Sequence, residues 1–279
     1  MPETLAASWR EVVAAGETAL RRAGVENPRL DSQLLLAEAA GVSRERLFIE
    51  DAVIEGATVR RFMELIGRRE AREPIAYILG RKDFRRLTLV VDRRVLIPRP
   101  ETELLVEVAH SLPRGARVVD VGTGSGAVAL ALKDERPDLE VWGTDVSAEA
   151  LEVARSNAAR LGLDVRWEQA DLLGDLATLG RAEERFDAVL ANLPYVEVGA
   201  ELEPEITQYE PAAALFAGVD GLEVIRRLIP QLGETPVVAL EVAFDQAPAV
   251  GELLHTGGWR RLEVLRDLGG HERVVLARR

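Results

Sequence analysis

From Gly115 to the carboxyl terminus, short apolar runs rich in β-forming residues alternate with segments of helical periodicity. Seven strands are expected, over residues 117–121, 141–145, 165–169, 186–191, 237–242, 262–265 and 272–277. Alternation of strand and helix is typical of a parallel sheet with helices on both faces. The sequence therefore predicts an α/β fold with a doubly wound, seven-stranded and mostly parallel sheet. Ligands of such sheets bind at the carboxyl ends of the central strands.

Residues 1–72 follow a different pattern and predict a small helical bundle. Trp9, Val12 and Leu20 have helical spacing, and Gly24 is a natural helix end. Residues 73–100 are expected to form a linker with a β-hairpin, whose turn falls at Asp92 to Arg94. The α/β domain then occupies residues 101–279.

The first strand of the α/β domain runs into a glycine-rich loop, Asp120-Val-Gly122-Thr123-Gly124-Ser125-Gly126. Glycines let the backbone approach a ligand closely, and the following helix presents free N–H groups. Asp145 ends the next strand, where a carboxylate can accept hydrogen bonds from both ribose hydroxyls. This pattern predicts a nucleotide-like cofactor. It fits a nicotinamide dinucleotide and S-adenosylmethionine equally well, and a glycine turn without a ligand is a third interpretation.

Asp171 and Leu172 follow the third strand and favour S-adenosylmethionine. An aspartate at this place can accept a hydrogen bond from an adenine amino group, and the leucine can cover the ring. The alternative is a surface aspartate that caps a helix. Asp120 is expected to face the loop or the sulfonium end of the cofactor, or else to bond to backbone amides.

The fourth strand ends in Asn192-Leu193-Pro194-Tyr195, which can hold a planar NH2 group. The side-chain carbonyl of Asn192 accepts one hydrogen bond and the Leu193 backbone carbonyl a second, while the Tyr195 ring lies against the planar substrate. Pro194 restricts Leu193 to an extended conformation and so helps to aim that carbonyl. These four residues are the predicted catalytic and substrate-binding group for methyl transfer to nitrogen. An ordinary strand-to-loop turn is the alternative.

Composition excludes several classes of function. The net charge of −12 argues against a protein that grips nucleic acid over its whole surface. The absence of cysteine excludes disulfides, thiolate metal sites and cysteine nucleophiles, and no metal site is expected. No segment approaches the roughly 18 apolar residues of a membrane span. The amino-terminal Met-Pro-Glu-Thr lacks the pattern of a signal peptide, so a cytoplasmic protein is expected.

Several stretches together resemble the class I methyltransferases that modify amide or exocyclic amino nitrogens, and in particular the HemK-type release factor glutamine methyltransferases. The resemblance covers essentially the whole chain and includes the helical amino-terminal domain. Besides the glycine loop and residues 192–195, the matching stretches are Glu73–Arg81, Leu96–Glu103, Tyr209–Pro211 with Leu215-Phe216, Asp220–Leu222 and Asp267–Gly269.

The resemblance implies a cofactor, a substrate and a set of site residues. S-adenosylmethionine is the implied cofactor, bound by residues 120 and 122–126, Asp145, Asp171, Leu172 and Asn192. The implied substrate is the glutamine in the Gly-Gly-Gln loop of peptide-chain release factors, which become methylated on the side-chain amide nitrogen. The helical domain would be a platform for this protein partner. A monomer without stable nucleic-acid binding is expected. Arg99 and Glu101 should shape the cleft.

One residue departs from the family pattern, since the usual motif is Asn-Pro-Pro-Tyr and position 193 is Leu here. The backbone carbonyl survives, so we expect near-normal amide recognition with a less rigid loop.

Three other functions stay open. A nucleic-acid methyltransferase could hold a flipped base with the same four residues. A nicotinamide-dependent oxidoreductase would need a proton donor, yet the only histidines, His110, His255 and His271, lie far from the motifs. The last is a cofactor-binding regulator.

Overall fold

The computed structural model describes residues 7–50, 52–54, 56–174 and 185–279. Its internal contacts divide the chain into two compact units. The helical unit contains Met1–Gly80 and Leu202–Tyr209, and the sheet unit contains Arg81–Glu201 and Glu210–Arg279. The first division falls inside the stretch 73–100 that the sequence analysis assigned to a linker. The return of residues 202–209 to the helical unit has no counterpart in the predicted domains.

The helical unit is a small bundle of helices around one apolar core. Its described elements are β1 (Ala7–Ser8), α1 (Trp9–Arg22), α2 (Pro28–Ala40), α3 (Arg46–Ile49), β2 (Val53–Ile54), α4 (Gly56–Glu70), α5 (Ile75–Leu79) and α9 (Pro204–Tyr209). Ser8 and Glu11 form a capping box that starts α1. Gly41, in the left-handed conformation, ends α2. Leu20, Leu35 and Phe62 are fully buried where α1, α2 and α4 pack together.

A buried ion cluster holds α9 to this bundle. The Arg69 guanidinium on α4 donates to Asp31 at 2.7 Å and to Glu205 at 2.9 Å. Arg72 also pairs with Glu205, at 2.5 Å, and the Tyr209 hydroxyl donates to the Ala71 carbonyl at 2.7 Å. Because Arg69 is almost fully buried, these charges depend on one another for compensation. Residues 202–209 are therefore an integral part of the helical unit.

The sheet unit contains the predicted doubly wound sheet, with strand order β10-β11-β9-β8-β5-β6-β7. Its strands are β5 (Arg117–Val121), β6 (Glu140–Asp145), β7 (Arg166–Gln169), β8 (Ala188–Ala191), β9 (Val237–Glu241), β10 (Arg261–Arg266) and β11 (Glu272–Arg278). β5 to β9 are parallel, and β11 pairs antiparallel with both β9 and β10. The predicted seven-stranded, mostly parallel α/β fold is confirmed.

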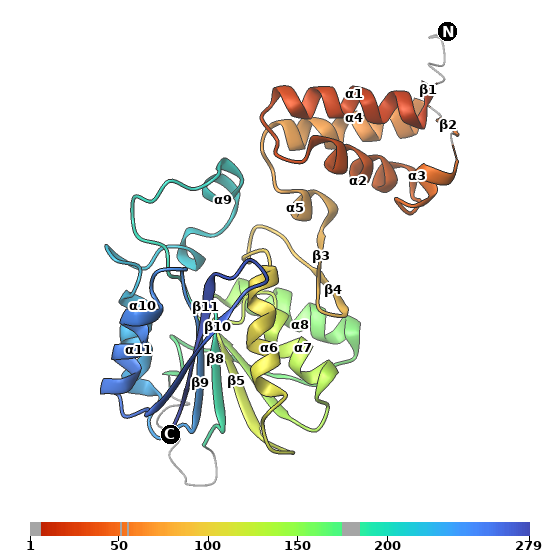
Figure 1. The fold of residues 1–279 in the computed structure, drawn as a ribbon. Helices are drawn as coiled ribbons and strands as arrows, with labels where there is room; N and C mark the ends of the chain where they lie inside the picture. Colours follow the sequence, from red (N-terminus) through yellow and green to blue (C-terminus); the bar gives the residue numbers. More distant parts are fainter. Residues whose placement is uncertain (1–6, 51, 55, 175–184) are drawn as a thin grey trace. The chain divides into compact units, whose positions relative to one another are not determined.

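Helices cover both faces of this sheet (Figure 1). They are α6 (Glu103–Ala109), α7 (Ala127–Glu135), α8 (Ala148–Leu161), α10 (Glu223–Leu228) and α11 (Ala247–Thr256), with short 3₁₀ turns η1 (Pro100–Thr102), η3 (Ala212–Ala214) and η4 (Ile229–Gln231). Val118 of β5 belongs to the core beneath α6 and α7, while Val119 belongs to the core beneath α10 and α11. Successive residues of a strand point to opposite faces, so both faces are apolar.

The stretch 73–100 contains a hairpin, but it is not the predicted one, whose turn was expected at Asp92 to Arg94. The strands are β3 (Arg81–Phe84) and β4 (Leu87–Val90), and the turn lies at Arg85-Arg86. Asp92 does form a local turn, in which its side chain accepts from the Arg94 backbone at 3.0 Å. That turn follows β4 and joins no strands. The prediction was wrong because it relied on the turn-favouring residue alone.

Among the residues that the structure describes, no helix combines the length and apolar character needed to cross a membrane.

Candidate active site

A cavity of about 410 Å³ opens at the carboxyl ends of β5, β6 and β8 in the sheet unit. Predicted site residues from four separate stretches line it, namely Gly122, Gly124, Asp145, Asp171, Leu172, Asn192, Leu193 and Pro194. Arg93 to Leu96 and residues 211, 213 and 214 complete much of the wall. The parallel strands thus bring the glycine loop and the acceptor motif to one cavity, as strand topology predicts.

Two glycines of the loop adopt conformations that place the backbone against this cavity. Gly122 and Gly124 have φ values of 72° and 55°. A Cβ at position 122 would lie 3.2 Å from Leu193 Cδ2, which is tighter than ordinary packing. The third glycine has another role, because a Cβ at Gly126 would meet Trp167 and Leu130 at 3.0 Å. Gly122 therefore allows the loop and the acceptor motif to touch, while Gly126 allows α7 to pack on the sheet.

Asp120 shapes the loop from inside the protein. It is buried, and its carboxylate accepts from Thr123 Oγ1 at 2.6 Å and from the Ala129 backbone at 3.2 Å. Burial raises its pKa to about 7, against the opposing hydrogen bonds. Ser125 is also buried, and its backbone carbonyl accepts from Asn157 at 3.0 Å. Asp120, Thr123, Ser125 and Gly126 lie behind the cavity wall, so they support the loop from outside the lining.

Asp145 is positioned to receive a hydroxylated ligand. One carboxylate oxygen accepts from the Gly124 backbone at 2.9 Å, and the other accepts from the Ser147 backbone at 2.9 Å. These two bonds fix the side chain at the cavity edge and leave further lone pairs on both oxygens. Burial raises the pKa of this carboxyl group. The arrangement is suited to a diol such as ribose.

Leu172 adopts a strained backbone conformation beside the cavity. Its φ of 62° lies in the left-handed region, which is uncommon for a residue with a branched side chain. Thr144 Oγ1 donates to the Leu172 carbonyl at 2.8 Å and helps to hold this turn. Asp171, beside it, is exposed and pairs with Arg227 on α10. The apolar side chain of Leu172 is thereby kept in the wall, while the Asp171 carboxylate already has a cationic partner.

The acceptor motif leaves β8 with Asn192 partly buried and Leu193 buried. Asn192 Nδ2 donates to Thr102 Oγ1 at 3.0 Å, and within the described chain no donor reaches Asn192 Oδ1. The Tyr195 hydroxyl donates to Glu241 at 3.4 Å. Burial, followed by the nearby Glu241 charge, raises the pKa of Tyr195. Asn192, Leu193 and Pro194 line the cavity and Tyr195 lies outside its lining.

The structure adds residues that the sequence analysis missed or left without a role. Arg99 Nη2 donates at 2.5 Å to Glu210, whose other oxygen accepts from the Ile97 backbone at 3.1 Å. This pair ties the segment that contains Arg99 to the stretch that supplies Pro211 to the cavity wall. Thr102 lies in the matching stretch Leu96–Glu103 but was given no role, and Glu241 was missed altogether. Glu241 ends an apolar strand at the same sheet edge as Asp145, and that position was the available signal.

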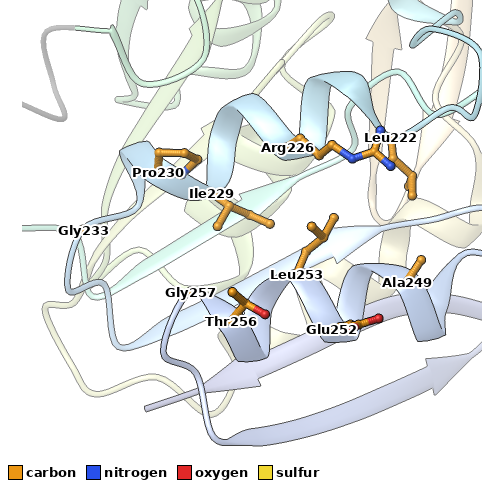
Figure 2. Close-up of a pocket in the computed structure, with 10 residues that line it drawn as sticks. All are labelled: Leu222, Arg226, Ile229, Pro230, Gly233, Ala249, Glu252, Leu253, Thr256 and Gly257. Carbon is orange, nitrogen blue, oxygen red and sulfur yellow. The ribbon is translucent and has the colours of Figure 1, made fainter.

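A second hollow, of about 630 Å³, lies between the α10–η4 segment and α11 (Figure 2). Its wall includes Arg226, Ile229, Pro230 and Leu253, and the Arg226 guanidinium is paired with Asp220 at 2.5 Å. Its lining contains none of the predicted site residues. Within the described parts of the chain, no group of three or more His, Asp or Glu side chains is arranged to hold a metal ion. The cavity beside the glycine loop is therefore the candidate active site.

Comparison with known proteins identifies the family. Residues 11–80 match the model of the PrmC N-terminal domain, and residues 118–205 match a methyltransferase domain. The chain is 40% identical to the release factor glutamine methyltransferase of Caulobacter vibrioides, over 99% of this chain and 96% of the relative. It is 38% identical to that of Deinococcus radiodurans, over 97% and 98%.

Solved structures agree on the fold. A methyltransferase from Pyrococcus furiosus superimposes with a TM-score of 0.51 at 19% identity, over 68% of this chain and 87% of that one. At this identity the likeness concerns the fold alone. The near full-length sequence relatives carry the assignment: the chain belongs to the family of release factor glutamine methyltransferases.

Proposed function

We propose that this protein transfers a methyl group from S-adenosylmethionine to the side-chain amide nitrogen of the glutamine in the Gly-Gly-Gln loop of peptide-chain release factors. The observation that carries the proposal is that one cavity is lined by both the glycine loop and Asn192 to Pro194. A methyl donor and a planar amide can therefore meet there. The family membership of the chain supplies the substrate class.

The cavity residues fit S-adenosylmethionine. Gly122 and Gly124 allow the chain to approach the ligand, and Asp145 offers free lone pairs to the ribose hydroxyls. Leu172 offers an apolar surface to the adenine ring. Asp171 fits the cofactor less well, because its carboxylate already pairs with Arg227. It would have to accept a hydrogen bond from the adenine amino group in addition to that ion pair. When bound, the cofactor supplies an electrophilic methyl carbon on a cationic sulfur.

The acceptor motif orients the nucleophile. An amide nitrogen is a poor nucleophile because its lone pair is delocalised, so positioning supplies much of the rate. Asn192 Oδ1 accepts one N–H of the glutamine amide, and the Leu193 carbonyl accepts the other. Both carbonyls favour the positive charge that develops on the nitrogen during transfer. The proton then leaves the methylated nitrogen for solvent.

We infer that the helical unit, predicted as residues 1–72, is the platform for the release factor. Supporting this role, Phe48 and Ile49 of α3 are two adjacent large apolar side chains that are 58% and 82% exposed, as a contact with an apolar partner surface requires. Exchange of both for Ser in the full-length enzyme should raise KM for release factor several-fold and leave cofactor affinity unchanged. Leu268→Ser, in an exposed loop of the sheet unit, is the control. An unchanged KM in the double variant would refute the platform.

The remaining parts of the proposal concern the state of the protein. We infer a cytoplasmic monomer that forms no stable complex with nucleic acid, in keeping with the net charge of −12. Size-exclusion chromatography with light scattering tests the monomer, and titration of labelled RNA and DNA tests the lack of binding.

Methyl-labelled S-adenosylmethionine provides the test of the function itself. The protein is incubated with unmodified release factor, with a release factor whose loop glutamine is Ala, and with total RNA or DNA. Label on the first substrate alone is the expected result. Label on nucleic acid at a comparable rate would overturn the proposal in favour of a nucleic-acid methyltransferase.

A further inference from the structure

The acceptor motif is a short span between two fixed points of the backbone. Upstream, Ala191 pairs with both strands that neighbour β8. Downstream, the N–H of Val196 donates at 2.9 Å and its carbonyl accepts at 2.8 Å, both to the stretch 215–217. Only residues 192–195 lie between these points. Within the described chain no donor engages the Leu193 carbonyl, so its aim depends on how this span is held.

A glutamine side chain holds the last residue of the span. Gln246 directly precedes α11, and its Nε2 donates to the Tyr195 carbonyl at 3.0 Å and to the Asp220 carbonyl at 3.4 Å. Its Oε1 accepts from the Ala243 backbone at 3.0 Å. Three segments that are distant in the sequence thus meet at one side-chain amide. They are the acceptor motif, the stretch 220–222 and the turn before α11.

The partners of this amide leave it a single orientation. A backbone N–H can only donate and a backbone carbonyl can only accept. The oxygen of Gln246 must therefore face Ala243, and its NH2 group must face the two carbonyls. Because carbonyls engage both of its N–H bonds, Gln246 has no donor left for a ligand, and it lies outside the lining of the cavity. Its effect on the site must pass through Tyr195.

A glycine allows the stretch 220–222 to reach the acceptor motif. Gly221 has a φ of 69°, and a Cβ there would lie 2.1 Å from the Tyr195 carbonyl oxygen and 2.6 Å from Gln246 Nε2. No side chain can occupy that space unless one of these groups moves. The Asp220 carboxylate shapes the same turn by accepting from the Leu222 backbone at 3.1 Å. This stretch, to which the sequence analysis gave no role, is thus built to fit against the acceptor motif.

We propose that Gln246 is a positioning residue, which together with Gly221 fixes the Tyr195 backbone and so aims the Leu193 carbonyl at the methyl-accepting NH2 group. This inference rests on the proposed function, in which that carbonyl holds the substrate amide. Pro194 makes the connection stiff, because its ring fixes its own φ and keeps Leu193 extended. A displacement at Tyr195 is therefore passed back along the chain to the carbonyl that holds the substrate.

Two substitutions separate this role from a role in the turn before α11. That turn has a second support, since the Gln246 N–H donates to the Ala243 carbonyl at 3.0 Å. In Gln246→Glu a carboxylate can still accept from the Ala243 backbone but cannot donate to Tyr195. Gln246→Met keeps the length of the side chain and removes both bonds. A residue that only supported the turn would tolerate Glu, whereas a residue that positions Tyr195 would not.

Kinetics of release factor methylation provide the first readout. Gln246→Glu, Gln246→Met and Gly221→Ala should each lower kcat by about 10²-fold, the cost of a reacting group misplaced by about 1 Å. KM for release factor should change only a few-fold, and the affinity for S-adenosylmethionine in calorimetry should be unchanged. Gly162→Ala, where φ is 68° and a Cβ meets nothing within 4 Å, is the matched control and should keep the parent kcat. Urea unfolding checks that each variant is folded in the assay.

A second readout does not require turnover. Tyr195-Val196 is the only Tyr-Val pair in the sequence, so protein labelled with ¹³C-carbonyl tyrosine and ¹⁵N-valine gives a single correlated signal for this peptide bond. Its carbonyl shift should move in both Gln246 variants and stay in place in Gly162→Ala. A parent-like kcat in Gln246→Glu, or an unmoved Tyr195 signal in both Gln246 variants, would overturn the inference. A parent enzyme that leaves release factor unmethylated would instead refute the proposed function, and the Tyr195 signal would still decide whether Gln246 holds the motif.

Discussion

Asp120→Asn should make the protein more stable at neutral pH and should remove part of its dependence on pH. The Asp120 carboxyl is buried, and its pKa rises from 3.8 to about 7 in the folded protein. A folded-state pKa above the unfolded value means that the native state binds more protons between these two values. The contribution of Asp120 to stability is therefore fully present below about pH 3.8 and is lost as pH rises toward 7.

The size of this loss follows from the change in pKa. Each pKa unit corresponds to about 1.4 kcal/mol, so ionised Asp120 costs roughly 4 kcal/mol of unfolding free energy above pH 7. Asn keeps an oxygen that can accept from Thr123 and Ala129 but has no proton to lose. The stability of the variant relative to the parent should thus rise by about 4 kcal/mol between pH 4 and pH 8. A constant offset from the amide cancels in this comparison.

Urea unfolding followed by tryptophan fluorescence measures the effect. Trp142, Trp167 and Trp259 all lie in the sheet unit with Asp120, and a Trp9→Phe background removes the signal of the helical unit. Asp164→Asn, which neutralises an exposed aspartate before β7, is the matched control for the change in net charge. If the stability difference between Asp120→Asn and the parent did not change between pH 4 and 8, the assignment of a buried, desolvated acid would be refuted.

Three further substitutions test the site. Gly122→Ala should weaken S-adenosylmethionine binding about tenfold or more, because alanine strains the positive φ and its Cβ crowds Leu193. The control is Gly115→Ala, where φ is nearly the same but a Cβ meets no neighbour, and it should leave binding unchanged. Arg99→Met should cost about 3 kcal/mol in urea unfolding, because Glu210 stays buried without its partner, and adding Glu210→Gln should recover part of the loss. Leu193→Pro should change the rate of methylation only a few-fold and keep the preference for glutamine, because proline retains the backbone carbonyl.

Each of these three has a contrary result. Equal binding by the two glycine variants would mean that contact between the loop and Leu193 has no role. An Arg99→Met enzyme as stable as the parent would show that Glu210 is solvated or neutral. A Leu193→Pro enzyme with a different substrate would place specificity in the side chain of position 193.

The sheet and the meeting point of the motifs could be predicted because they follow from local patterns. Strand–helix alternation fixes a parallel sheet, and parallel strands bring their carboxyl ends to one edge. Gly122, Asp145 and Asn192 lie at the carboxyl ends of three such strands and line one cavity. Asp120 is the informative exception. It also lies near the carboxyl end of a strand, yet its side chain is buried and accepts a hydrogen bond from Thr123 of the glycine loop.

The rest depends on contacts between distant segments, which a single sequence does not encode in any local pattern. Thr102 and Glu241 meet the acceptor motif only through tertiary packing. The return of α9 to the helical unit rests on ion pairs between Glu205 and arginines more than 130 residues earlier in the chain. The predicted position of the hairpin turn was wrong for a related reason. Asp92 forms a local turn that joins no strands, whereas the turn between β3 and β4 contains no residue that favours turns strongly.

The most direct measurement of the central claim is fragmentation mass spectrometry of release factor after incubation with the enzyme and S-adenosylmethionine. The account predicts one added methyl group, located on the side chain of the loop glutamine, and its loss when Asn192 is replaced by Ala. The Ala variant should still bind the cofactor in calorimetry. Methylation at another residue, or undiminished methylation of the same glutamine by Asn192→Ala, would contradict the account.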